Sequence, residues 1–253
     1  MKVTFIGVGE ACDANYPNTS LLLDVPGGPP FQVMLDCGFT TPHQYFKSCS
    51  DPDALKYLWI SHFHGDHFFG TPLLLLRLGE MGRQAPLTIV GPAGVEEKIE
   101  QALSLAYSGF LTRKEFPLHY STMAPGDEMS DGGLHWRCAL SDHSRPSLVV
   151  RIDAAGTSLF YSGDGRPTSQ SRDLAGGCRL IVHEAFRVKG ETPGHGTVAD
   201  CIPFAVKAGA EMLALVHVSR NDRKNFRPEI MGMISQVEAC RVFLPEPGDS
   251  VLI

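Results

Sequence analysis

The sequence lacks paired cysteines, a long apolar run and a signal-peptide pattern. Its seven cysteines are scattered and include no Cys-x-x-Cys pair, so we expect reduced, mostly buried thiols rather than a disulfide framework. The longest apolar run, Pro72–Leu76, stops at Arg77 and is far too short to span a bilayer. The first residues read as a strand leading into a turn. We therefore expect a soluble, cytoplasmic protein with no membrane partner.

An excess of positive charge is also missing. The chain has 22 Lys and Arg against 28 Asp and Glu, a formal net charge of -6. Such a balance argues against general affinity for a polyanion, although a local basic patch could still bind one. The 253 residues are 43% hydrophobic, enough for a substantial core, and no linker or repeat divides them. We expect a single domain over residues 1–253.

Strand patterns come in two batches, and each batch is followed by helical patterns. The expected strands are Val3–Val8, Ser20–Val25, Phe31–Asp36, Lys56–Ser61 and Leu87–Val90, then Leu134–Leu140, Ser147–Ile152, Thr157–Tyr161, Leu180–His183, Met212–Val218 and Asp249–Ile253. An amphipathic helix follows Gly94, and a second spans Val198–Ala208. Thr197 or Asp200 could cap the second helix; we favour Asp200, because it puts Pro203 in the first turn. The pattern predicts an α/β protein with two packed sheets and helices outside.

The most informative segment is His62–His67, with three imidazoles and a carboxylate within six residues. Nitrogen and carboxylate donors at this density are typical of a site for zinc or a similar divalent metal. One loop cannot satisfy two tetrahedral ions, so further donors must come from elsewhere.

These residues resemble the metallo-β-lactamase superfamily. The segment His62–His67 is similar to its HxHxDH signature, and the extension to Gly70 resembles the ribonuclease Z branch. Further matches follow in the branch's order: Asn18-Thr19-Ser20, Asp36-Cys37-Gly38, Asp142-His143-Ser144, Ser162-Gly163-Asp164-Gly165-Arg166-Pro167, His183-Glu184-Ala185-Phe186, Gly194-His195-Gly196-Thr197 and His217-Val218-Ser219-Arg220. Two positions depart from the pattern: Phe186 stands where Thr is usual, and Gly196 replaces Ser.

The resemblance implies an αββα four-layer sandwich, with two mixed β-sheets flanked by helices. It also implies two divalent metal ions. The donors suit zinc, and they would also tolerate manganese or iron. The donors of the first ion would be His62, His64 and His143; those of the second would be Asp66, His67 and His217, with Asp164 bridging.

The same resemblance implies a reaction. Two ions about 3.5–4 Å apart can share a water and lower its pKa toward ~7, so a bridging hydroxide would attack phosphorus. Asp66 would orient this hydroxide or accept its proton, and His195, held by Glu184, would protonate the leaving alkoxide. Arg166 and Arg220 are candidate phosphate contacts.

The expected substrate depends on an insertion. Ribonuclease Z proteins typically carry a tRNA-gripping arm between the third histidine and the bridging aspartate, but here only residues 144–163 lie between them. We therefore expect a phosphodiesterase that acts on a small or flexible phosphodiester or on an RNA end. Dimers are common among similar proteins, so a homodimer is one option for its assembly. Three alternatives stay open: tRNA 3′-end processing, hydrolysis of a carbonyl or sulfate ester on the same fold, and a non-catalytic metal-binding or redox protein.

Overall fold

The apolar strand segments gather into two seven-stranded sheets that pack face to face in a computed structural model, which describes residues 1–113 and 116–253. The first sheet has the order β14-β1-β2-β3-β4-β5-β6, with bounds Ser250–Leu252, Lys2–Gly7, Ser20–Val25, Phe31–Leu35, Leu55–Trp59, Leu87–Gly91 and Leu118–Thr122. The second has the order β13-β12-β11-β10-β9-β8-β7, with bounds Arg241–Phe243, Met212–Val216, Leu180–Glu184, Thr157–Tyr161, Leu148–Ala154, Leu134–Leu140 and Glu128–Asp131.

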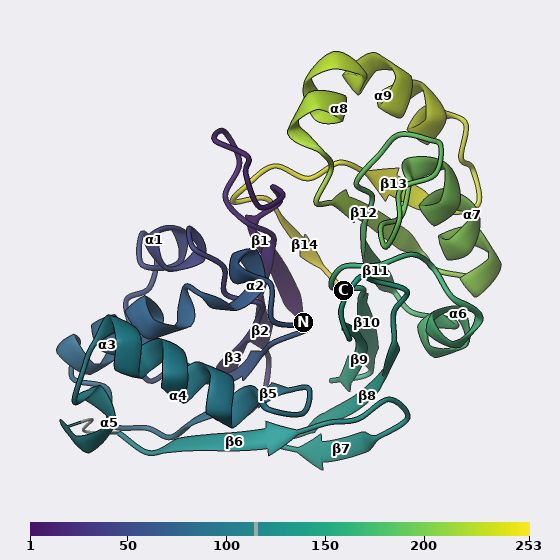
Figure 1. Ribbon diagram of the computed structural model, residues 1–253. Helices are drawn as coiled ribbons and strands as arrows, with labels where there is room; N and C mark the ends of the chain where they lie inside the picture. Colours follow the sequence, from purple (N-terminus) through teal and green to yellow (C-terminus); the bar gives the residue numbers. More distant parts are fainter. Residues whose placement is uncertain (114–115) are drawn as a thin grey trace.

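Helices cover the outer face of each sheet (Figure 1). The first half of the chain supplies α1 (Thr41–Tyr45), α2 (Gly65–Phe68), α3 (Thr71–Glu80), α4 (Val95–Ala106) and α5 (Phe110–Arg113). The second half supplies α6 (Ser169–Ala175), α7 (Val198–Ala208), α8 (Arg220–Asn225) and α9 (Arg227–Ser235). The predicted αββα four-layer sandwich is therefore confirmed.

The two sheets share one pairing pattern. In each, reading from β14 in the first and from β7 in the second, three antiparallel pairings are followed by three parallel ones. Parallel strands bring their carboxyl ends to one edge of a sheet, where loops can carry functional side chains. The loops after β3 and β4 in the first sheet, and after β10, β11 and β12 in the second, are therefore placed to meet.

Alternate residues of the strands fill the space between the sheets. Trp59 from β4 stacks on Trp136 from β8 with ring centroids 6.1 Å apart, and both side chains are fully buried. Tyr57 and Tyr161 lie in the same layer, which joins the two halves of the chain into one core. Two further apolar clusters hold the helices onto the outer faces. Among the described residues, no helix is both long and apolar enough to cross a membrane.

The cap predicted for α7 is wrong. Thr197 is the N-cap: its side chain accepts a hydrogen bond from the Asp200 backbone N–H, and the helix starts at Val198. Pro203 consequently lies inside the helix rather than in its first turn. Ile202 and Pro203 lie at or near the surface while Cys201 and Phe204 are buried, so packing of the apolar face keeps the helix continuous past the proline.

Candidate metal centre

The predicted metal donors come together at one edge of the sandwich, from loops of both sheets. His62 and His64 follow β4, and Asp66 and His67 lie in α2 directly after them. From the second sheet, His143 follows β8, Asp164 follows β10 and His217 follows β12. Seven side chains separated by up to 155 positions therefore meet because the strand ends that carry them lie at the same edge.

The first group of donors consists of His62, His64, His143 and Asp164, whose ligand atoms all lie within 4.8 Å of one another. His64 Nδ1 is 3.1 Å from both His62 Nε2 and His143 Nε2. His62 is fully buried, whereas His64 and His143 are only partly buried. This side of the cluster therefore faces solvent and is accessible to a substrate.

The second group consists of Asp66, His67, Asp164 and His217, and all four are buried. His67 Nε2 lies 3.3 Å from a carboxylate oxygen of Asp66 and 3.3 Å from one of Asp164. His217 Nε2 lies 3.2 Å from Asp66 Oδ2 and 3.5 Å from Asp164 Oδ1. Asp164 belongs to both groups, as expected of the bridging carboxylate that the family resemblance implies.

Unpartnered buried atoms test whether these residues suit a metal. His67 Nε2 and Asp164 Oδ1 are buried and have no hydrogen-bond partner, although they lie 3.3 Å apart. Buried polar atoms are rarely left unpaired, and an ion between such atoms would satisfy both. Mixed imidazole and carboxylate donors are those that zinc and similar divalent cations take. The donor set therefore fits divalent metal ions.

Asp36 supports the second group, and sequence reasoning assigned it no role. Its buried carboxylate accepts hydrogen bonds from the Ser61 backbone N–H, the Ser61 hydroxyl and the Tyr161 hydroxyl, each at 2.7 Å. The fourth contact, also 2.7 Å, is to His67 Nδ1. A carboxylate can only accept, so His67 carries its proton on Nδ1 and turns Nε2 toward the cluster. The match at Asp36-Cys37-Gly38 was the one signal for this residue.

Two residues of this site have strained backbones. Asp36 has φ 60° and His217 has φ 55°, in the left-handed region that non-glycine residues seldom occupy. Gly165, next to Asp164, has φ 135°, and a Cβ there would lie 1.6 Å from Ser141 Oγ. Only glycine fits at 165, and its N–H donates to Glu184 at 3.0 Å. Strain of this kind is typical of functional sites.

The charges within the cluster are interdependent. Burial raises the pKa of Asp66, but hydrogen bonds from His217 and His67 more than offset this, so the net pKa lies below the ordinary value. For His67, burial lowers the pKa, and the carboxylates of Asp164 and Asp36 raise it well above the ordinary value overall. The cluster therefore keeps the Asp66 carboxylate ionised, as a cation ligand must be, and a bound cation would displace the proton that the raised pKa places on His67 Nε2.

Glu184 and His195 form a second pair beside the donors. Glu184 Oε1 lies 3.2 Å from His195 Nδ1 and accepts hydrogen bonds from the backbone N–H groups of Gly165 and Gly196. His195 Nε2 is thus left to face the cluster, with its ring stacked 6.0 Å from that of His217. Burial lowers the pKa of His195, but the Glu184 hydrogen bond and charge raise it overall. Phe186, the departure from the family pattern, stacks on His195 at 4.7 Å.

The two candidate phosphate contacts have partners inside the protein. The Arg166 guanidinium donates two hydrogen bonds to the Thr192 carbonyl, at 3.0 and 2.7 Å. Arg220 forms an ion pair with Glu10. Both side chains therefore hold loops around the site, and their contact with a substrate stays a prediction.

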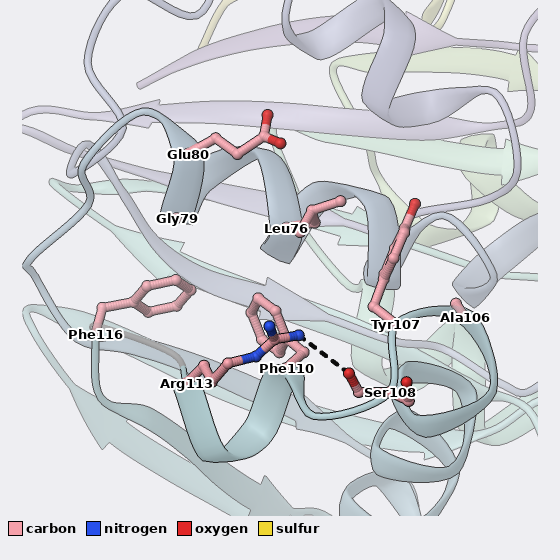
Figure 2. Close-up of a pocket in the computed structure, with 9 residues that line it drawn as sticks. All are labelled: Leu76, Gly79, Glu80, Ala106, Tyr107, Ser108, Phe110, Arg113 and Phe116. Carbon is pink, nitrogen blue, oxygen red and sulfur yellow. Dashed lines mark hydrogen bonds between the residues drawn. The ribbon is translucent and has the colours of Figure 1, made fainter.

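A separate cavity of about 540 Å³ lies among α3, α4 and α5 (Figure 2). Leu76, Tyr107 and Phe110 line it, and Arg113 donates from its rim to the Ser108 carbonyl at 3.1 Å. None of its described lining residues is a predicted metal donor. This cavity therefore lies outside the candidate metal centre.

Comparison with known proteins places this site in a family. The chain is 25% identical to ribonuclease Z of Methanosarcina acetivorans, over 90% of each chain, and 28% identical to ribonuclease BN of Escherichia coli O139:H28, over 97% of this chain and 96% of that one. The structure of human short-form tRNase Z has the same fold, with a TM-score of 0.80, 23% identity and coverage of 100% and 99%.

Fold, donor clusters and relatives together define a metal-dependent hydrolase of the metallo-β-lactamase superfamily, in its ribonuclease Z-like branch. The resemblance predicted from the motifs is confirmed. Within this class, the family model described as anti-Pycsar protein Apyc1 matches residues 1–240, and the chain belongs to that family.

Proposed function

We propose that the protein hydrolyses a small or flexible phosphodiester with two bound divalent cations, for which zinc suits the donors best. One observation carries the choice of substrate. Residues 144–163 hold only the end of the His143 loop, strands β9 and β10 with the turn between them, and the lead-in to Asp164. No room is left there for an arm that grips a tRNA body, and the net charge of -6 does not favour a broad polyanion surface.

The residues of the candidate metal centre have separate roles in the proposed reaction. His62, His64 and His143 would hold one cation and Asp66, His67 and His217 the other, with Asp164 shared. When bound, such a pair polarises the phosphoryl group and acidifies water. Asp66, kept ionised by its two histidine neighbours, orients the attacking water or accepts its proton. Attack at phosphorus breaks one P–O ester bond and gives an alcohol and a phosphomonoester.

The leaving alkoxide needs a proton, and His195 is placed to supply it. Glu184 fixes Nδ1, so the proton on Nε2 points toward the donors. The three backbone N–H groups that bind the Glu184 carboxylate, from Gly165, Phe186 and Gly196, keep that carboxylate in place. Glu184 is therefore a positioning residue for His195.

The first test compares substrates. We expect the metal-loaded protein to hydrolyse bis(p-nitrophenyl) phosphate and a dinucleotide with a kcat/KM well above that for a precursor tRNA. Nitrophenyl acetate and nitrophenyl sulfate, run beside them, test hydrolysis of carbonyl and sulfate esters. Precursor tRNA cleavage as efficient as small-diester cleavage would favour the relatives' ribonuclease activity instead. Faster turnover of the acetate or the sulfate would favour the ester-hydrolase alternative.

The second test concerns proton transfer. We expect His195→Ala to lower kcat for a poor leaving group, such as the ribose hydroxyl of a dinucleotide, by roughly 100- to 10,000-fold while metal content is retained. His119→Ala, at an exposed position of β6, is the matched control and should keep full activity. An unchanged rate across pH for His195→Ala would remove this residue from the reaction.

A further inference from the structure

A cavity of about 360 Å³ borders the loops that carry the first group of donors. Its described lining is mostly apolar and includes Phe63, Ala93, Met123 and Leu140, with two cationic side chains, Lys98 and Arg145. The surrounding elements are the ends of β5 and β8, the segment after β6 and the start of α4. None of these lining residues was assigned a role from the sequence.

The cavity shares two loops with the candidate metal centre. Phe63 lies between His62 and His64 in the chain, and neighbouring Cα atoms are only about 3.8 Å apart. A second lining residue, Arg145, follows His143 by two residues. A group bound in the cavity can therefore be part of a molecule whose phosphate reaches His64 and His143, the accessible donors.

The charges of the cavity complement an anion with an apolar substituent. Lys98 Nζ lies 5.5 Å from the centroid of the Phe63 ring, a cation–π contact. Within residues 1–113 and 116–253, neither Lys98 nor Arg145 forms an ion pair, and Arg145 is exposed. The side chain of Leu140 is 42% exposed, so the cavity presents apolar surface to solvent beside the candidate metal centre.

We propose that this cavity binds a planar aromatic substituent of the phosphodiester, on the side of phosphorus away from the leaving group. The proposal rests on the proposed function and adds a substrate class to it. An apolar cavity of about 150 Å³ is enough for benzene, so the volume here accommodates a substituted or fused ring. Phe63 offers its ring for an aromatic contact, and its edge-on packing against Phe68, with centroids 5.6 Å apart, holds that ring in place.

The experiment uses substrates that share one leaving group. Bis(p-nitrophenyl) phosphate and methyl p-nitrophenyl phosphate both release p-nitrophenolate, but only the first leaves an aromatic group behind. Leu140→Ala removes part of the wall, and Ala93→Trp fills the space from an exposed position. We expect each variant to lower kcat/KM for the bis-aryl diester roughly tenfold, mainly through KM, and to change the methyl diester by less than about twofold.

Controls separate the possible outcomes. Leu105→Ala, at a 90% exposed position of α4 outside the cavity lining, should change neither substrate. Equal losses for both substrates, or no loss for either, would overturn the proposal. So would an equal loss for hexyl p-nitrophenyl phosphate, because the cavity would then accept any apolar group.

A binding measurement keeps this proposal distinct from the proposed function. Diphenyl phosphate is titrated calorimetrically into the metal-loaded wild-type protein and into Ala93→Trp. We expect tighter binding of diphenyl than of dimethyl phosphate, and a roughly tenfold loss in the variant. Such a result with no diester turnover would refute the proposed function alone. Unchanged binding of diphenyl phosphate in Ala93→Trp would refute the cavity assignment, whatever the activity.

Discussion

Asp36 shows how one buried carboxylate can organise a site without being a donor itself. It takes hydrogen bonds from Ser61, two residues after β4, from Tyr161 at the end of β10 and from the His67 ring in α2. These partners are 25, 125 and 31 residues away in sequence, and they come from both halves of the chain. Carboxylates in this position orient a metal-binding histidine and raise its basicity.

Asp36→Asn is therefore expected to weaken metal binding by roughly 10- to 100-fold, because the amide cannot hold His67 as a carboxylate does. Metal content after dialysis against graded chelator measures this. Tyr161→Phe removes one of the hydrogen bonds to Asp36 and keeps its charge, so its effect should be much smaller. Equal metal affinity of Asp36→Asn and wild type would show that His67 does not depend on this carboxylate.

Residue by residue, donors were easier to predict than their supports. The residues His62–His67 carry a dense local signal, and His143, Asp164 and His217 follow strands in a fixed order. The structure brings all seven together, while their binding of metal stays a prediction. Asp36 depends on hydrogen bonds across distant strands, and the partners of Arg166 and Arg220 are a loop carbonyl and Glu10. Contacts between residues so far apart in the chain leave no recognisable pattern in the sequence, so they could not be predicted from it.

Helices and strands with many buried apolar residues were easier to predict than those with exposed residues. β2, β8, β10 and α7 have the predicted bounds. β2 and β10 contain short continuous apolar runs, whereas apolar residues alternate in β8 and recur at helical spacing in α7. β7 was missed: three of its four residues are exposed, and in the described part of the chain its one partner strand is β8. β13 has three residues, which is too short for a periodic pattern. β7 and β13 therefore depend on the neighbouring strand more than on their own residues.

Pro203 gives a prediction at this scale. It lies inside α7 at an exposed position, where its ring removes one backbone hydrogen bond from the helix. Pro203→Ala should restore that bond and stabilise the protein by roughly 1–3 kcal/mol, seen as a higher Tm. Lys207→Ala, near the exposed C-terminal end of the same helix, should change Tm little. A lower Tm for Pro203→Ala would mean that the proline ring makes contacts worth more than the hydrogen bond.

For the whole molecule, the seven donors join the two sheets at their shared edge. A cation bound there contacts only the folded arrangement, so its binding adds to the free energy of unfolding, by about 2.7 kcal/mol per site at a hundredfold excess over Kd. Removing metal with a chelator should lower Tm, and adding zinc back should restore it, in differential scanning calorimetry. Asp164→Asn, which alters the donor shared by both groups, should lose most of this dependence. The same Tm with and without metal would argue against a centre that joins the sheets.

The strand β14 has a consequence for how the protein is made. It pairs antiparallel with β1, and the Met1 ammonium donates to the Ile253 carbonyl at 2.9 Å. β1 therefore leaves the ribosome well before β14, and one side of β1 stays unpaired until β14 has been made. Until then β1 exposes unsatisfied backbone groups, so nascent chains are most prone to associate during this interval.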